Sequence, residues 1–272
     1  MTQGTTQPDR FQVDFVDGHV HLDHTRERQP ERLTWLRQVG CLPVSWAFSH
    51  RADSVQDLRA YLSARVKTFE AVRAGGLACY HLVGVHPRTI PPDLAPEAVR
   101  ALLLPFLDDP FCRGLGEIGL ETGSSREAEI LEAQLALAPE IEQRDQVLGL
   151  HTPREDKARV LDQTLALLEP YRRWHDRILL DHLTPDTLPV ALAAGFWAGM
   201  TLSPAKCSAA DVEIAAARLP GLTDRLLLNT DSGGRFFEDL YRFHQQGALP
   251  NDLRRRLCRD NALRFFRLEG RV

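Results

Sequence analysis

The stretch Asp17-Gly18-His19-Val20-His21-Leu22-Asp23 follows an apolar run, Phe11 to Val16, that predicts a first β-strand over Phe11–Asp17. Side chains two residues apart along a strand point to the same face, so His19 and His21 are expected to aim at one point. Two neutral imidazoles at a strand end suit a borderline metal ion such as zinc, manganese or nickel. Taken alone, the pair also fits two polar residues at the start of a loop.

Seven further apolar runs alternate with longer segments of helical periodicity. The eight strands are predicted at Phe11–Asp17, Cys41–Ala47, Ala78–Val85, Cys112–Gly119, Gln146–His151, Ile178–His182, Phe196–Leu202 and Leu226–Thr230. Strands that alternate with helices imply parallel pairing through crossover connections. Eight such units predict an α/β fold of the closed (β/α)8 TIM-barrel type. An open doubly wound sheet is the alternative, and it would require the strand order to reverse.

The intervening helices carry recognisable caps. Ser54 is expected to cap a helix that runs to Ala74, and Ser208 with Asp211 resembles a capping box ahead of Val212–Leu219. Pro139 is expected to kink a helix over Arg126–Arg144. Further helices are predicted at Glu155–Leu168, Asp186–Ala194, Phe236–Phe243 and Asp252–Phe266.

Length and composition indicate one globular domain. The chain has 272 residues, of which 43% are hydrophobic and 26% charged, and α/β barrels of about 250 residues routinely form a single domain. We expect residues 1–10 to form a disordered tail and residues 11–272 to form the barrel. The net charge of -4 argues against a protein that coats nucleic acid, whose surface is usually basic, but not against a local basic site.

The cysteines favour a reducing compartment. Five lie far apart and no C-x-x-C pair occurs, so buried reduced thiols are expected at Cys41, Cys79, Cys112, Cys207 and Cys258. This pattern is typical of a cytoplasmic protein. Residues 1–10 lack the apolar core of a signal peptide and no apolar run is long enough to span a bilayer, so no membrane partner is expected. The oligomeric state stays open.

Six potential metal ligands stand at the predicted strand ends. In a TIM barrel the active site lies at the C-terminal ends of the strands, and there the sequence places His19, His21, Glu117, His151, His182 and Asp231. Four histidines and two carboxylates suffice for two ions that share a bridging carboxylate. Each residue also has a simpler interpretation: a hydrogen-bonded structural histidine, or a helix cap at Glu117 or Asp231.

The order of these motifs resembles the TatD family of metal-dependent hydrolases, within the amidohydrolase-like barrels. The matching elements are His-x-His at His19, Gly-Glu-Ile-Gly-Leu at Gly116, the two later histidines and Thr230-Asp231-Ser232, and Gly84-Val85-His86-Pro87 resembles a further family element. The resemblance implies that one metal is held by His19, His21, Glu117 and Asp231 and a second by Glu117, His151 and His182. It also implies magnesium-dependent DNase activity, as commonly described for the family.

Three segments depart from the DNase members. Thr-Asp-Ser continues with Gly233-Gly234 instead of the frequent proline, and His151-Thr152-Pro153-Arg154 and Thr201-Leu202-Ser203-Pro204-Ala205-Lys206 are more similar to a TatD-related branch. These departures bear on DNA as the substrate and leave the implied metal site unchanged.

A basic residue follows four of the predicted strand ends. Such residues suit phosphate recognition, and those predicted to contact an anionic substrate are Arg88, Arg154, Lys206 and Arg235. Each alone also fits a solvated loop charge. His86 is either a substrate contact or a partner of the metal ligands.

These observations predict a divalent-metal-dependent hydrolase with Asp231 and Glu117 as catalytic residues. Asp231 would ligate a metal and accept the proton of the attacking water, and Glu117 would bridge two ions. The histidines suit zinc or manganese, whereas the resemblance favours magnesium. The substrate is expected to be a phosphoester, either DNA or a small molecule. The alternatives are an amidohydrolase or lactonase and a non-catalytic barrel that binds a ligand or protein.

Overall fold

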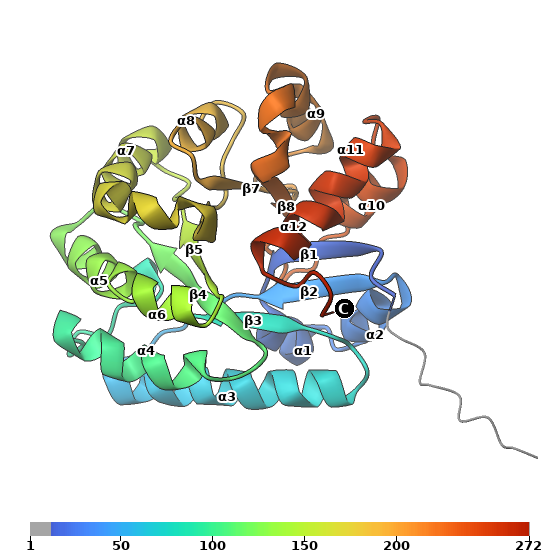
Figure 1. The fold of residues 1–272 in the computed structure, drawn as a ribbon. Helices are drawn as coiled ribbons and strands as arrows, with labels where there is room; N and C mark the ends of the chain where they lie inside the picture. The colour runs from blue at the N-terminus through green and yellow to red at the C-terminus, as the bar shows by residue number, and fades with distance from the viewer. Residues whose placement is uncertain (1–11, 272) are drawn as a thin grey trace, which may run out of the picture.

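Eight parallel strands form one barrel in chain order. The computed structural model describes residues 12–271, apart from the side chains of residues 220–222, so the predicted tail of residues 1–10 lies outside the described residues. The strands are β1 (Phe15–Val20), β2 (Cys41–Ser45), β3 (Tyr80–Val83), β4 (Cys112–Gly119), β5 (Val147–His151), β6 (Ile178–Leu180), β7 (Trp197–Thr201) and β8 (Leu226–Asn229). Each pairs with the next in parallel, without the reversal of a doubly wound sheet. The TIM-barrel prediction is confirmed (Figure 1).

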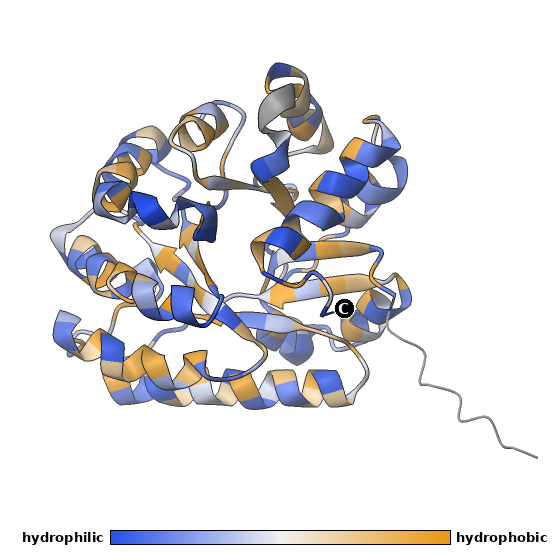
Figure 2. Ribbon diagram, in the orientation of Figure 1, coloured by the Kyte–Doolittle hydropathy of each residue, from blue (hydrophilic) through white to orange (hydrophobic). Residues whose placement is uncertain are grey.

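The helices form an outer layer around the strands (Figure 1). They are α1 (Leu22–Arg28), α2 (Glu31–Gln38), α3 (Val55–Ala74), α4 (Val99–Leu107), α5 (Ser125–Leu135), α6 (Ala138–Gln143), α7 (Lys157–Leu168), α8 (Leu188–Ala193), α9 (Ala209–Arg218), α10 (Asp239–Gln246), α11 (Asn251–Arg255) and α12 (Asn261–Phe265). A π-helical turn at Arg256–Asp260 joins the last two. In the hydropathy view, apolar residues fill the strands and alternate with polar ones around the helices (Figure 2).

The cap predictions agree with the helix boundaries. The Ser54 side chain accepts a hydrogen bond from the Asp57 N–H at the start of α3, and Ser208 and Asp211 form the reciprocal capping box of α9. Pro139 does more than kink a helix: the predicted Arg126–Arg144 segment is two helices, with Pro139 in the first turn of the second. Proline fits there because a first-turn N–H has no partner within the helix. Helices α1, α2 and α4 were not predicted.

Side chains alternate across the barrel wall, as strand geometry requires. One apolar cluster fills the barrel interior, with Val16, Val44, Trp46, Leu179 and Leu227 among its members. Their immediate neighbours belong to a second cluster, between the strands and the helices, which includes Phe15, Ile178, Leu180, Leu226 and Leu228. The alternation therefore determines which strand-end side chains point into the barrel mouth.

The first and last strands meet at the end of the barrel that carries the predicted ligands. Val20 forms a bridge with Ser232, the Asp231 N–H donates to the His19 carbonyl at 2.9 Å, and the His21 N–H donates to the Ser232 carbonyl at 2.6 Å. Barrel closure itself thus brings Asp231 next to the His19–His21 pair.

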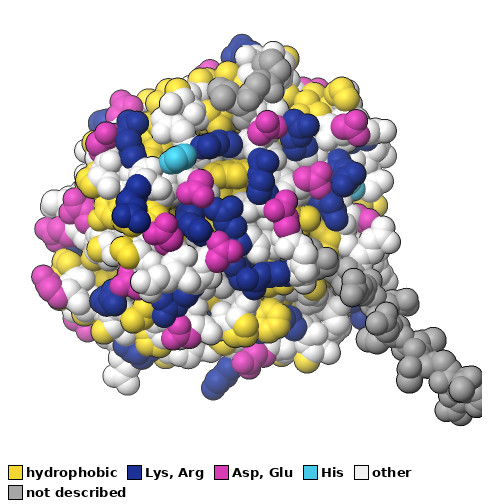
Figure 3. All heavy atoms as spheres, viewed as in Figure 1, with side chains coloured by type: hydrophobic (Ala, Val, Ile, Leu, Met, Phe, Trp, Pro, Cys, Tyr) yellow, Lys and Arg dark blue, Asp and Glu magenta, His cyan; other side chains and the backbone are white. Residues whose placement is uncertain are grey.

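The C-terminal segment covers the opposite end, where the strands begin. Arg113, in β4, donates to the Phe266 carbonyl at 3.0 Å, and Arg259 donates to the Val13 carbonyl at 2.9 Å. Figure 3 shows basic side chains interspersed with acidic ones over one face of the molecule, and Arg267 with Asp176 at 3.0 Å is one surface pair. Among the described residues, no helix has the length and apolar character needed to cross a bilayer.

Candidate metal centre

The six predicted ligands converge at the C-terminal mouth of the barrel. His19, His21, Glu117, His151 and His182 are at most 5% exposed. Three overlapping groups each have ligand atoms within 4.8 Å of one another: His19–His21–Glu117, His19–His182–Asp231 and His86–Glu117–His151. The convergence of all six residues argues against the interpretation of each as an isolated structural side chain.

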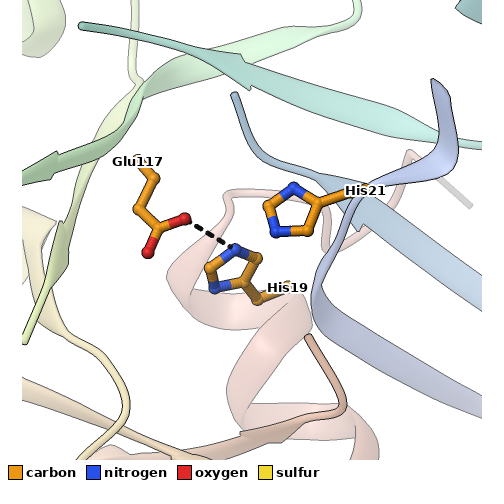
Figure 4. Close-up of side chains that lie close together, drawn as sticks. All are labelled: His19, His21 and Glu117. Carbon is orange, nitrogen blue, oxygen red and sulfur yellow. Dashed lines mark ion pairs between the residues drawn. The ribbon is translucent and has the colours of Figure 1, made fainter. Parts of the chain in front are cut away.

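An irregularity in β1 turns both histidines inward. Val16 faces the interior and Val20 faces the helices, and the pairing register shifts between Asp17 and Val20. The shift reverses the alternation, so that His19 and His21 point into the mouth beside Glu117 (Figure 4). The strand therefore continues through His19, beyond the predicted end at Asp17. Such bulges commonly re-aim a side chain next to an active site.

The imidazoles of His19, in β1, and His21, directly after it, are oriented by hydrogen bonds away from the centre. His19 Nδ1 lies 2.6 Å from an Asp181 carboxylate oxygen, and its ring stacks on Trp46 at 4.1 Å between centroids. His21 Nδ1 donates to the Trp46 carbonyl at 3.1 Å, and its Nε2 lies 2.9 Å from Asp231 Oδ1. In both rings Nε2 is the atom that faces the centre.

Glu117 occupies the middle of the cluster. The register of β4 shifts between Leu115 and Ile118, both of which face the helices, and this places Glu117 on the interior side. Its carboxylate is bonded to His151 Nδ1, lies 3.1 Å from His182 Nε2 and 3.4 Å from His19 Nε2. Glu117 is therefore the carboxylate that candidate ligands from three other strands share.

His182 and Asp231 both adopt left-handed backbone conformations, with φ of 60° and 55°. Non-glycine residues rarely do so, and they cluster at functional sites. Asp231 Oδ2 accepts from Lys206 Nζ at 2.6 Å. Asp231 caps no described helix, because α10 begins only at Asp239 with Glu238 as its N-cap. The cap interpretation of Asp231 is therefore wrong.

The donor set fits a divalent cation. His19 Nε2 is buried, faces carboxylates of Glu117 and Asp231 at 3.4 and 3.8 Å, and has no hydrogen-bond partner. An unpaired buried nitrogen is costly, and a cation between it and the carboxylates would remove that cost. Imidazole nitrogen with carboxylate oxygen is the donor combination of zinc and manganese sites.

Burial and neighbouring charges shift the pKa values of three candidate ligands. Burial opposes the charged imidazolium of His19, but the Glu117 and Asp181 carboxylates outweigh it and raise its pKa to about 10. Burial likewise opposes ionisation of Glu117, yet the surrounding histidines hold its pKa well below the usual range. Burial together with the Lys206 charge lowers the pKa of His182 to about 4, so this ring is neutral.

A small hollow opens over the cluster. Its lining comprises Phe48, His86, Arg88, Glu117, His151, Thr152, Arg154, His182, Lys206 and Asp231. Three of the four predicted basic contacts thus lie in the hollow, whereas Arg235 is exposed and lies outside its lining. Arg88 pairs with Glu121 at 2.9 Å, and Lys206 pairs with Asp231. Within the described part of the chain, Arg154 makes no salt bridge.

His86 is placed against Glu117, with its Nε2 3.5 Å from Oε2. Its Nδ1 accepts the Arg88 N–H at 3.1 Å, so the proton of the neutral ring is on Nε2. A protonated Nε2 cannot ligate a metal but can donate a hydrogen bond into the hollow. This geometry is compatible with both predicted roles, substrate contact and partner of the ligands.

Three residues around the centre were not predicted. Asp181 orients His19, Trp46 supports its ring, and Glu121 holds His151 Nε2 at 2.6 Å. Asp181 and Glu121 carried a detectable signal, because each is an acidic residue next to or shortly after a strand end. Nothing in the sequence distinguishes Trp46 from an ordinary core residue.

Comparisons with known proteins agree with this architecture. The family model described as TatD related DNase matches residues 16–233. A TatD-like protein from Archaeoglobus fulgidus is 28% identical, with 93% of this chain and 100% of that chain covered and a TM-score of 0.75. No curated protein matches the sequence.

Two structures from Escherichia coli share the fold at lower identity. The phosphotriesterase homology protein, solved with phosphate in its active site, is 14% identical, with 93% of this chain and 99% of that chain covered and a TM-score of 0.68. A TatD homolog is 18% identical, with 94% and 98% covered and a TM-score of 0.64.

Proposed function

Because the chain belongs to the TatD family of metal-dependent hydrolases, within the amidohydrolase superfamily, we propose that it hydrolyses phosphoester bonds in an anionic substrate, either DNA or a small phosphoester. The observation that carries the proposal is the composition of the hollow. Arg88, Arg154 and Lys206 line it directly above the ligand cluster. Among the described residues that line it, Phe48 is the only apolar one, which gives little support to an amidase or lactonase for apolar substrates.

We propose two divalent ions, zinc or manganese, with Glu117 shared between them. His19, His21 and Asp231 would complete one site, and His151 and His182 the other. When bound, the ions would supply Lewis-acid chemistry, polarising the scissile group and lowering the pKa of a water. The buried, unpaired cysteines support a cytoplasmic location, where thiols stay reduced.

The remaining work belongs to side chains of the hollow. Arg154 has a free guanidinium to bind a phosphate oxygen. His86 presents Nε2–H towards Glu117 and the centre, where it can donate to an oxygen that gains negative charge during hydrolysis. Asp231, 2.9 Å from His21 Nε2, can accept the proton of the attacking water.

The experiment compares a phosphodiester with a neutral ester carrying the same leaving group, each with zinc, manganese or magnesium. Arg154→Gln should raise KM for the phosphodiester about 10- to 100-fold, since hydrogen bonds to charged groups contribute about 1.5–3 kcal/mol. The neutral ester should not respond. Arg235→Gln is the matched control, because it makes the same substitution at an arginine that lies outside the hollow. Turnover of the neutral ester alone would refute the phosphoester proposal.

A further inference from the structure

Three buried polar side chains connect His19 to His182 on the side away from the hollow. Asp181, Thr201 and Asn229 are each 0% exposed. Thr201 and Asn229 are direct register partners in β7 and β8, and Asp181 follows β6. The three therefore form one layer of the barrel interior, immediately behind the metal centre.

Short hydrogen bonds link the layer to both histidines. Asn229 Nδ2 donates to Asp181 Oδ1 at 2.8 Å, and Asp181 Oδ2 lies 2.6 Å from His19 Nδ1. On the other side, Thr201 Oγ1 donates to Asn229 Oδ1 at 2.8 Å and lies 2.7 Å from His182 Nδ1. A single amide thus stands between two ligand histidines from different strands.

The direction of every proton in this chain follows from the amide. Asp181 Oδ1 also accepts the His182 N–H at 2.7 Å, so this oxygen acts as an acceptor and the Asn229 NH₂ must face it. The amide oxygen then faces Thr201 and takes its only hydroxyl proton. Thr201 can therefore only accept from His182, whose Nδ1 carries the proton. The lone pair of His182 is left on Nε2, 3.1 Å from Glu117 Oε1. An ionised carboxylate can only accept, so this arrangement requires a cation between the two atoms, and without one Glu117 favours a proton on Nε2.

Lys206 favours the opposite tautomer. Its Nζ lies 2.9 Å from His182 Nδ1, and an ammonium group can only donate. A bond from Lys206 would require a bare Nδ1 and would move the proton to Nε2, where it blocks metal binding. Thr201 and Lys206 therefore compete for the same nitrogen.

We propose that Asn229 is a positioning residue that, through Thr201 and Asp181, keeps a proton on Nδ1 of His182 and of His19 and so directs Nε2 of both rings to the metal centre. Partners of ligand histidines commonly fix the tautomer and affect metal affinity 10- to 100-fold. The inference rests on the proposed metal-dependent function, but it concerns proton positions that exist without metal or substrate.

The first test is the tautomer of His182 in the metal-free Glu117→Ala protein, which lacks the carboxylate that faces Nε2. The tautomer is read by nitrogen-15 NMR, with His182→Gln in the same background to assign the signal. In this background, both the protein with Thr201 and its Thr201→Ser variant should carry the proton on Nδ1. Thr201→Val, which keeps the shape and removes the hydroxyl, should move it to Nε2. Lys206→Met should leave it on Nδ1. An unchanged tautomer in Thr201→Val, or a switch in Lys206→Met, would overturn the proposal.

The second test is a Zn²⁺ titration against a competing chelator. Thr201→Val should weaken one site about 10- to 100-fold while Thr201→Ser binds like wild type. Asn229→Leu removes the hydrogen bonds to both Thr201 and Asp181, so it should weaken both sites. This variant replaces Thr201→Val in the test if Thr201→Val does not fold. Wild-type Zn²⁺ affinity in Asn229→Leu would refute the role of the amide. Absence of Zn²⁺ binding by wild type would instead refute the proposed metal function, and the tautomer measurement would still decide the role of Asn229.

Discussion

Replacing Asp231 by Asn separates its chemistry from its conformation. Asn tolerates the left-handed conformation that Asp231 adopts at φ 55°, so the backbone should be unaffected. Asn also keeps one neutral oxygen to face His21 Nε2, and His19, His21 and Glu117 remain to hold the cation. What it loses is the negative charge and basicity of a carboxylate. Removing a general base typically lowers kcat by about 10²–10⁴-fold, which corresponds to about 3–5 kcal/mol of activation free energy.

The assay measures kcat on a phosphodiester and the metal content of the same sample. Asp156→Asn is a matched control: Asp156 is also left-handed, at φ 47°, but is exposed and does not line the hollow, so its replacement should leave kcat unchanged. Turnover close to wild type in fully metallated Asp231→Asn would show that Asp231 is not the proton acceptor. Loss of the metal itself would show that ligation is its main role.

Three further perturbations test the centre and the core. Glu117→Gln removes the charge that offsets two cations, and metal titration should then show one tight site instead of two; two tight sites would exclude a bridge. Because carboxylates of Glu117 and Asp181 raise the pKa of His19 to about 10, Zn²⁺ binding at pH 7.5 should displace the His19 proton, and calorimetry in buffers of different ionisation enthalpy should detect its release. Burial and two nearby arginines hold the pKa of His81 well below 6.5, so the folded protein keeps it neutral while the unfolded chain protonates. Protonation of His81 in the unfolded chain should lower the free energy of unfolding as the pH falls below about 6.5, by up to about 1.4 kcal/mol per pH unit. The Tm of wild type should therefore fall more steeply between pH 7 and 5 than the Tm of His81→Leu. An equal fall in both proteins would contradict this.

The sequence predicts the fold and the convergence of the six candidate ligands because both depend on local patterns. Each of the eight apolar runs is a strand, and the ligand residues stand at the strand ends where a barrel collects them. The rest depends on contacts that no local pattern encodes. Pairing of Arg88 with Glu121 and of Lys206 with Asp231 is set by loop conformation, so the sequence overstates the free positive charge at the rim.

The largest difference between the predicted and the observed strands lies in β1, and it explains how the candidate metal centre is built. Strict alternation from Val16 would place Gly18 and Val20 on the interior side, and would turn His19 and His21 away from the centre. The register shifts in β1 and β4 reverse this order just before His19 and Glu117. At His182 and Asp231, the left-handed backbone conformation of the residue itself interrupts the alternation. Regular alternation does explain the inward position of the candidate ligand His151, because Val147, four residues earlier in the same strand, also faces the interior. The centre is thus assembled largely where the strands depart from regular geometry, whereas Asp181, Thr201 and Asn229 behind it continue the regular inward positions of β6, β7 and β8. The regular layer fixes the orientation of the His19 and His182 imidazoles. The irregular positions above it bring side chains close together that regular strands would keep apart.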